Sequence, residues 1–156
     1  GWNKGKPLRS MTPESTNFIP KSALVSGILG LVPFVLLSAV IVYQSPNVHG
    51  EVIAALLAYG ALILSFLGGV RWGTAISGTS HVPLSIQLWI SVVPSLVGWA
   101  AILIEIPAAL LVLTVAFSLM LFTDYMIAGA PIWYLRLRVI LSLPVIACLL
   151  VVLSVQ

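Results

Sequence analysis

Five apolar stretches, each about long enough to cross a membrane, dominate the sequence. They cover 23–43, 52–70, 84–103 and 107–123, and the fifth begins between Pro131 and Val139 and ends at Val155. A membrane-spanning α-helix needs about 20 mostly apolar residues. Only 7% of the residues are charged, which is too few to cover a water-soluble globule with polar side chains. The sequence therefore predicts an all-α, polytopic membrane protein built as a bundle of five transmembrane helices.

Residues 1–22 differ from the rest in being rich in Pro, Ser, Thr, Asn and Lys. We expect them to form a polar N-terminal tail, with 23–156 as the transmembrane domain. The first ten residues stop just before a Met, so an added leader or a processed extension is as consistent with them as a native tail. Without the three basic residues of that segment, the remaining basic and acidic residues are equal in number. The basic balance therefore gives no support to a nucleic-acid partner.

The basic residues predict the orientation in the membrane. Short connections make successive helices antiparallel, and five spans then place every Lys and Arg on one side. These residues are Lys4, Lys6, Arg9, Lys21, Arg71, Arg136 and Arg138. Because basic loops remain on the cytoplasmic side of a membrane, the N-terminus should be inside, in the cytoplasm or the mitochondrial matrix. The C-terminus should be outside.

The second apolar stretch contains a regular series of small residues. Small side chains recur every four residues, and a further glycine precedes one of them; the set is Ala61, Ser65, Gly68, Gly69 and Gly73. Such a strip lets a neighbouring helix approach closely in a membrane. We expect this helix to be central in the bundle.

A second group of residues lies where the fourth and fifth stretches meet. Asp124 directly follows the fourth stretch, and a lone carboxylate at the membrane edge is costly, so it should have a cationic partner. The candidates are Arg71, Arg136 and Arg138. Arg136 and Arg138 point about 200° apart on a helix, so at most one of them faces the bundle interior. A structural salt bridge, an anion or lipid-headgroup site, and a proton relay through Asp124 are all compatible with this pattern.

Three aromatic residues accompany these charges and are typical of the membrane–water interface. Trp72 follows Arg71 directly, and Trp133 and Tyr134 open the fifth stretch. Trp133 is three residues from Arg136, and Tyr134 is four residues from Arg138. On a helix, this spacing would let each guanidinium group lie along an aromatic ring.

The remaining inventory argues against several chemistries. His49 and His81 fall on opposite faces of the membrane, which excludes a two-histidine metal or haem site. The predicted spans contain no Lys for a Schiff base, and their serines have no His within the bundle. We therefore expect no catalytic residue, no metal and no cofactor.

The blocks YGALILSFLGGVRWG (59–73) and PIWYLRLR (131–138), with Asp124 between them, resemble the membrane proteins grouped as domain of unknown function 3429. The resemblance extends from about Pro20 to Val155. It implies a bacterial or mitochondrial inner-membrane location and no established activity. The family pattern often has His where this chain has Arg71, which argues against a titrating group at that position because Arg retains its proton.

Two classes of function follow from these observations. The first is a non-catalytic packing, assembly or accessory component of a larger membrane complex, with membrane lipids and a membrane-protein partner or a second copy as its contacts. The second is a small carrier or channel for a proton, an anion or a lipid that uses Asp124 and the Arg cluster. An enzyme acting on a lipid or quinone is a third and weaker interpretation. A transporter needs polar groups near the membrane midplane, and all the charges here map to helix ends or loops, which favours the first class.

Overall fold

The computed structural model describes residues 18–44, 49–78, 80–126 and 130–156, and within them the regular secondary structure is helical. The helices are α1 (Lys21–Tyr43), α2 (His49–Ile76), α3 (Leu84–Ala101), α4 (Ile106–Met126) and α5 (Ile132–Ser154). All 5 are long and apolar enough to span a membrane, which confirms the predicted all-α bundle. Most of the predicted polar tail, including its first ten residues, lies outside the described part of the chain.

Two helix boundaries affect the site. Helix α2 continues to Ile76, so Arg71 lies within the helix and not at its end. Helix α5 begins at Ile132, directly after Pro131, whereas the sequence left its start open as far as Val139. A proline suits this position because a helix start leaves backbone N–H groups without a partner inside the helix. Arg136 and Arg138 therefore both lie in the first turns of α5.

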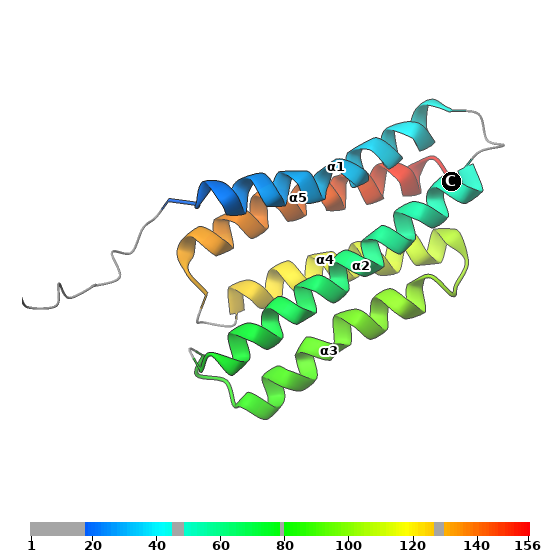
Figure 1. The fold of residues 1–156 in the computed structure, drawn as a ribbon. Coiled ribbons are helices and arrows are strands. Elements are labelled where there is room, and N and C mark those ends of the chain that lie inside the picture. The colour runs from blue at the N-terminus through cyan, green and yellow to red at the C-terminus, as the bar shows by residue number, and fades with distance from the viewer. Residues whose placement is uncertain (1–17, 45–48, 79, 127–129) are drawn as a thin grey trace, which may run out of the picture.

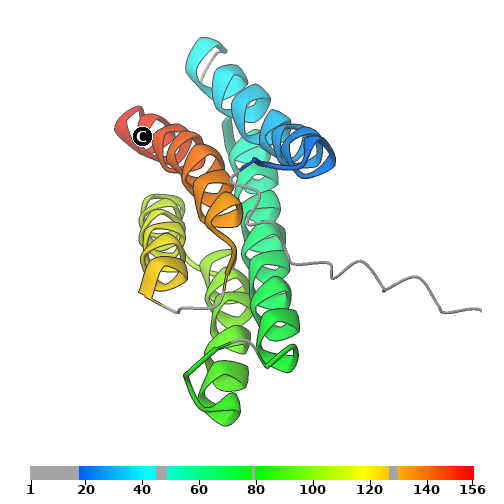
Figure 2. The same ribbon diagram turned by 90° about the vertical axis from the view of Figure 1, so that its left-hand side faces the viewer.

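The five helices run side by side, and helices that follow one another in the chain are antiparallel (Figure 1). Each helix contacts the next one in the chain, and α5 contacts α1, so the five helices form a closed ring. Helix α2 also touches α4 across this ring. The most extensive contact joins α2 to α3. A view turned by 90° shows the same order, with α1 and α5 together and α3 beside α2 (Figure 2). The starts of α1, α3 and α5 and the ends of α2 and α4 therefore meet at one end of the bundle.

The centre of the bundle is held by aromatic packing between three helices. Phe34 of α1 meets Phe117 of α4 edge to face, with ring centroids 5.9 Å apart, and Tyr59 of α2 at 5.1 Å. The Tyr59 hydroxyl donates a hydrogen bond of 2.7 Å to the carbonyl oxygen of Gly30. This contact joins α2 to α1 through a donor that would otherwise lack a partner in lipid.

The closest backbone approach joins α2 to α3 at glycines. A Cβ atom on Gly68 would collide with the backbone carbonyl oxygen of Ser91. Farther along the same interface, a Cβ atom on Gly98 would lie 3.0 Å from the Cα atom of Ala61. The absence of side chains at Gly68 and Gly98 therefore sets the distance between these two helices.

Within this chain, the predicted packing strip on α2 is not one continuous contact. Ala61 and Gly68 contact α3, but Ser65, Gly69 and Gly73 are exposed, and a Cβ atom on either of these two glycines would meet nothing within 4 Å. Consecutive helix residues point about 100° apart, so Gly68 and Gly69 cannot face the same neighbour. From Ser65 onward, the residues at four-residue spacing lie on a face of α2 that is turned away from the bundle.

Candidate functional site

Three charged residues from three helices meet at the end of the bundle where α4 gives way to α5. Arg71 Nη2 lies 2.5 Å from Asp124 Oδ1, and Arg138 Nε lies 2.8 Å from Asp124 Oδ2. Arg71 Nη2 also donates a hydrogen bond of 2.7 Å to the Thr123 hydroxyl. The salt bridge predicted for Asp124 is thus present, and it links α2, α4 and α5. We call Arg71, Asp124 and Arg138 the ion cluster.

The ion cluster is almost entirely enclosed by protein. Arg71 and Arg138 are 8% and 6% exposed, and the Asp124 side chain is 11% exposed. Arg138 lies six residues into α5, about 9 Å along the helix axis from its start. An ion pair at this depth has little water to screen it, so the loss of one partner would be costly.

The charges of the ion cluster do not balance. Two guanidinium groups share one carboxylate, and each carboxylate oxygen already accepts a bond from one of them. Within the described residues, Nη2 of Arg138 is buried and has no hydrogen-bond partner. The cluster therefore carries an excess positive charge and an unused N–H donor group.

The other residues predicted near this site lie around the ion cluster. Arg136 is exposed on a different face of α5 from Arg138, in agreement with the predicted angle between them. Trp72 is also exposed, at 41%. Trp133 and Tyr134 are partly buried and contact each other edge to face, with ring centroids 6.1 Å apart. These positions fit an aromatic layer at the membrane surface.

Sequence reasoning missed two polar side chains that bear on the site. Thr123 accepts a bond from Arg71, and Ser142 lies one turn beyond Arg138 with its hydroxyl buried and without a partner among the described residues. The signal for Ser142 was its spacing of four residues from Arg138, which places both side chains on one face of α5. Hydroxyls are common in membrane helices, so the spacing alone did not single it out.

Hydroxyl groups farther from the ion cluster mostly bond to their own helix. Thr114 and Ser118 donate to carbonyl oxygens one turn earlier in α4, and Ser91 does the same in α3. The described residues contain no group of three His, Cys, Asp or Glu side chains arranged to hold a metal ion. The chemistry that this site can perform is the binding of an anion or an acceptor group by Arg138.

Comparisons with known proteins agree with the helical membrane architecture. The family model described as "Protein of unknown function (DUF3429)" matches residues 19–154. A protein named Transmembrane protein 69 from Xenopus tropicalis is 39% identical over 127 residues, which cover 79% of this chain. The mouse protein of the same name is 33% identical over 129 residues, or 80% of this chain.

The matched region covers 50% of the Xenopus protein and 52% of the mouse protein, so the chain spans about half the length of these relatives. No solved structure matches the chain. The names of the relatives describe membrane proteins and state no activity.

Proposed function

The chain belongs to the family of membrane proteins described as DUF3429, and from this premise we propose that it is a non-catalytic accessory component of a larger membrane complex. It would hold a transmembrane helix of a partner protein against the exposed face of α2. Six small residues of that face define what we call the α2 docking face: Ala54, Ala55, Ala58, Ser65, Gly69 and Gly73.

The observation that carries this proposal is the contrast between the exposed faces of α2 and α4. The outward positions of α4 carry large apolar side chains, among them Leu111, Leu119 and Phe122, which are more than half exposed. Such side chains are suited to lipid. The six positions of the α2 docking face carry only Ala, Ser and Gly, with the exposed Leu62, Phe66 and Ile76 beside them on α2. Small residues in membrane helices are enriched where another helix packs.

The length of the α2 docking face favours a complete membrane-spanning helix as its occupant. Ala54 and Gly73 lie about 29 Å apart along a helix axis, at about 1.5 Å per residue. The hydrocarbon core of a bilayer is about 30 Å thick. A peripheral segment or a single loop would leave most of this face exposed to lipid, whereas a transmembrane helix would cover it from end to end.

The ion cluster supports an accessory role over transport. Both carboxylate oxygens of Asp124 accept bonds from guanidinium groups, so a proton relay would first have to break two buried ion pairs. The other acidic residues of the described chain, Glu51 and Glu105, belong to the opposite ends of α2 and α4. Charges grouped at the ends of a bundle do not form a path across it.

We further propose an inner membrane, bacterial or mitochondrial, with the N-terminus on the cytoplasmic or matrix side. The support for the location is the family resemblance. The support for the orientation is the distribution of charge, because the basic residues of the described chain gather at one end of the bundle, at Lys21, Arg71, Arg136 and Arg138.

The test is affinity purification of tagged protein from the membranes of its own organism in a mild detergent. Ser65→Leu places a bulky side chain on the α2 docking face and should remove a co-purifying membrane protein that the unchanged chain retains. Ser118→Leu is the matched control, because Ser118 is also exposed but lies on α4. Loss of the partner with both variants, or retention with both, would contradict the proposal. Co-purification of a second tagged copy alone would show a homo-oligomer instead.

A further inference from the structure

A cavity of about 320 Å³ lies next to the ion cluster, among α1, α2, α4 and α5. This volume falls at the lower end of the range seen for small-molecule sites, about 300–1,000 Å³. The α2 residues that line the cavity are not those of the docking face, and the inference drawn from the cavity does not depend on the proposed function. Exposed residues on its rim, Ser26 of α1 and Phe66 of α2, place an opening between these two helices.

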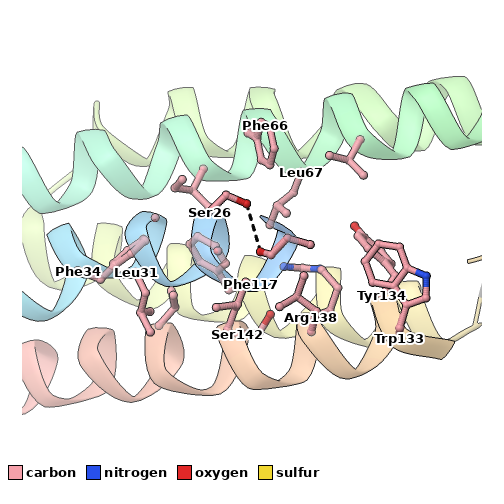
Figure 3. Close-up of a pocket in the computed structure, with 18 residues that line it drawn as sticks. Ser26, Leu31, Phe34, Phe66, Leu67, Phe117, Trp133, Tyr134, Arg138 and Ser142 are labelled. Carbon is pink, nitrogen blue, oxygen red and sulfur yellow. Dashed lines mark hydrogen bonds between the residues drawn. The ribbon is translucent and has the colours of Figure 1, made fainter. Parts of the chain in front are cut away.

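The walls of the cavity are mostly apolar, and their buried polar side chains belong to α5. Phe34, Ile63, Leu67 and Phe117 contribute carbon surface from three helices. Figure 3 shows Arg138 and Ser142 on α5 near Phe117 and across from Leu67 of α2, with Trp133 and Tyr134 farther along α5 toward its start. A neutral apolar ligand would fit against the apolar walls, but it would leave the polar groups of Arg138 and Ser142 without a hydrogen-bond partner.

The two polar groups on the α5 wall are buried and have unused hydrogen-bonding capacity. Within the described residues, neither Arg138 Nη2 nor Ser142 Oγ has a partner, and the residues are 6% and 2% exposed. A buried donor without an acceptor is expensive, especially on a charged group. Because Nε of Arg138 is already bound to Asp124, the free end of the same guanidinium is held in place beside the cavity.

The net positive charge of the ion cluster favours a negatively charged ligand. Arg71 and Arg138 exceed Asp124 by one positive charge, and the surrounding helices and lipid do little to screen it. An anionic oxygen next to Arg138 Nη2 would balance the cluster and accept the unused hydrogen bond. The Ser142 hydroxyl could donate to a second oxygen of the same group.

We propose that this cavity binds a long-chain fatty acid, with its carboxylate on Arg138 Nη2 and Ser142 Oγ and its acyl chain along the apolar walls. From Arg138 the lining residues of α5 continue to Val145, about 10 Å deeper into the membrane at the rise of an α-helix. A single chain fits a cavity of this size and leaves through the opening between α1 and α2. A phospholipid phosphate offers the same anionic oxygens, but it brings two acyl chains and a larger head.

The test is binding of palmitate to the purified full chain in a neutral detergent, measured by calorimetry. Hexadecanol, inorganic phosphate and a short-chain phosphatidic acid are the comparison ligands. Palmitate should bind, and hexadecanol should bind at least about tenfold more weakly, because it lacks the charged acceptor for Arg138. Equal binding of palmitate and hexadecanol would overturn the assignment of the head to Arg138. Stronger binding of phosphate or phosphatidic acid than of palmitate would overturn the choice of a fatty acid.

Two variants test independently whether palmitate binds in this cavity. Arg138→Gln removes the charge, and Gly30→Leu fills the cavity from α1 without touching the ion cluster, since a Cβ atom on Gly30 has only the Tyr59 hydroxyl nearby, at 3.9 Å. Each should weaken palmitate binding by about tenfold or more. Gly50→Leu, at an exposed glycine outside the cavity where a Cβ atom would meet nothing within 4 Å, is the matched control and should bind normally. If Arg138→Gln does not fold, Gly30→Leu decides: unchanged binding in that folded variant would place the ligand elsewhere and overturn the proposal.

Discussion

Arg138 Nε donates a hydrogen bond of 2.8 Å to Asp124 Oδ2, so the first turns of α5 are tied to the last turn of α4 across the loop that joins these helices. Arg71 binds the other oxygen of the same carboxylate from α2. One acidic side chain therefore fixes the relative positions of three helices at one end of the bundle. In lipid, where the apolar faces of helices gain little from burial, such polar contacts contribute to the choice of neighbours.

Asp124→Asn should strongly destabilise the bundle. It leaves two buried guanidinium groups without a counterion, and removal of one partner from a buried ion pair costs about 3–5 kcal/mol. Unfolding in mixed detergent micelles at increasing dodecyl sulfate measures this loss. Glu105→Gln is the control, because Glu105 is an exposed carboxylate at the other end of the bundle and should change stability little. A loss for Asp124→Asn as small as that for Glu105→Gln would show that the ion cluster does not hold the helices together.

The neighbouring glycines of α2 should respond oppositely to the same substitution. In Gly68→Ala the new methyl group meets the backbone carbonyl of Ser91, which cannot rotate away, so overpacking should cost about 1–3 kcal/mol. In Gly69→Ala the methyl group meets nothing within 4 Å, and stability should be unchanged or slightly higher.

The same unfolding assay compares the two alanine variants directly. Equal losses would mean that both glycines pack against a helix of the same chain. That result would contradict the observed orientation of α2.

The orientation in the membrane is testable with a fluorescent reporter that matures only in the cytoplasm. Fused after Gln156 in a bacterial host, it should remain dark, because five spans and an internal N-terminus place the C-terminus outside. The same reporter fused after Gly78, with the rest of the chain removed, should fluoresce. Fluorescence from the Gln156 fusion would reverse the proposed orientation or change the number of spans.

The sequence predicted the helices and the charge pairing well for physical reasons that act locally. The length of an apolar run determines whether it can span a bilayer, and a carboxylate at the edge of the membrane needs a cation wherever the fold places it. Asp124 had few candidate partners, and two of them, Arg71 and Arg138, lie beside it in the structure.

The inward and outward faces of α2 could not be predicted in the same way. The interior of a membrane bundle is about as apolar as lipid, so hydrophobicity does not distinguish the two faces. The small-residue spacing through Ser65 and Gly69 predicted a helix-packing face but could not say whether that face is turned toward the bundle, and in the structure both residues are exposed. The extension of α2 beyond Arg71 was missed because an arginine is normally costly within a span, and here Asp124 offsets that cost.

The most direct test of the accessory role is photo-crosslinking in native membranes from single positions on α2 and α4. A photoreactive residue at Gly69 should capture a distinct membrane protein, whereas the same residue at Leu119, on the lipid-facing side of α4, should capture lipid alone. Mass spectrometry of the adducts identifies the captured molecule. Lipid adducts from both positions, or the same protein adducts from both, would contradict a docking face on α2.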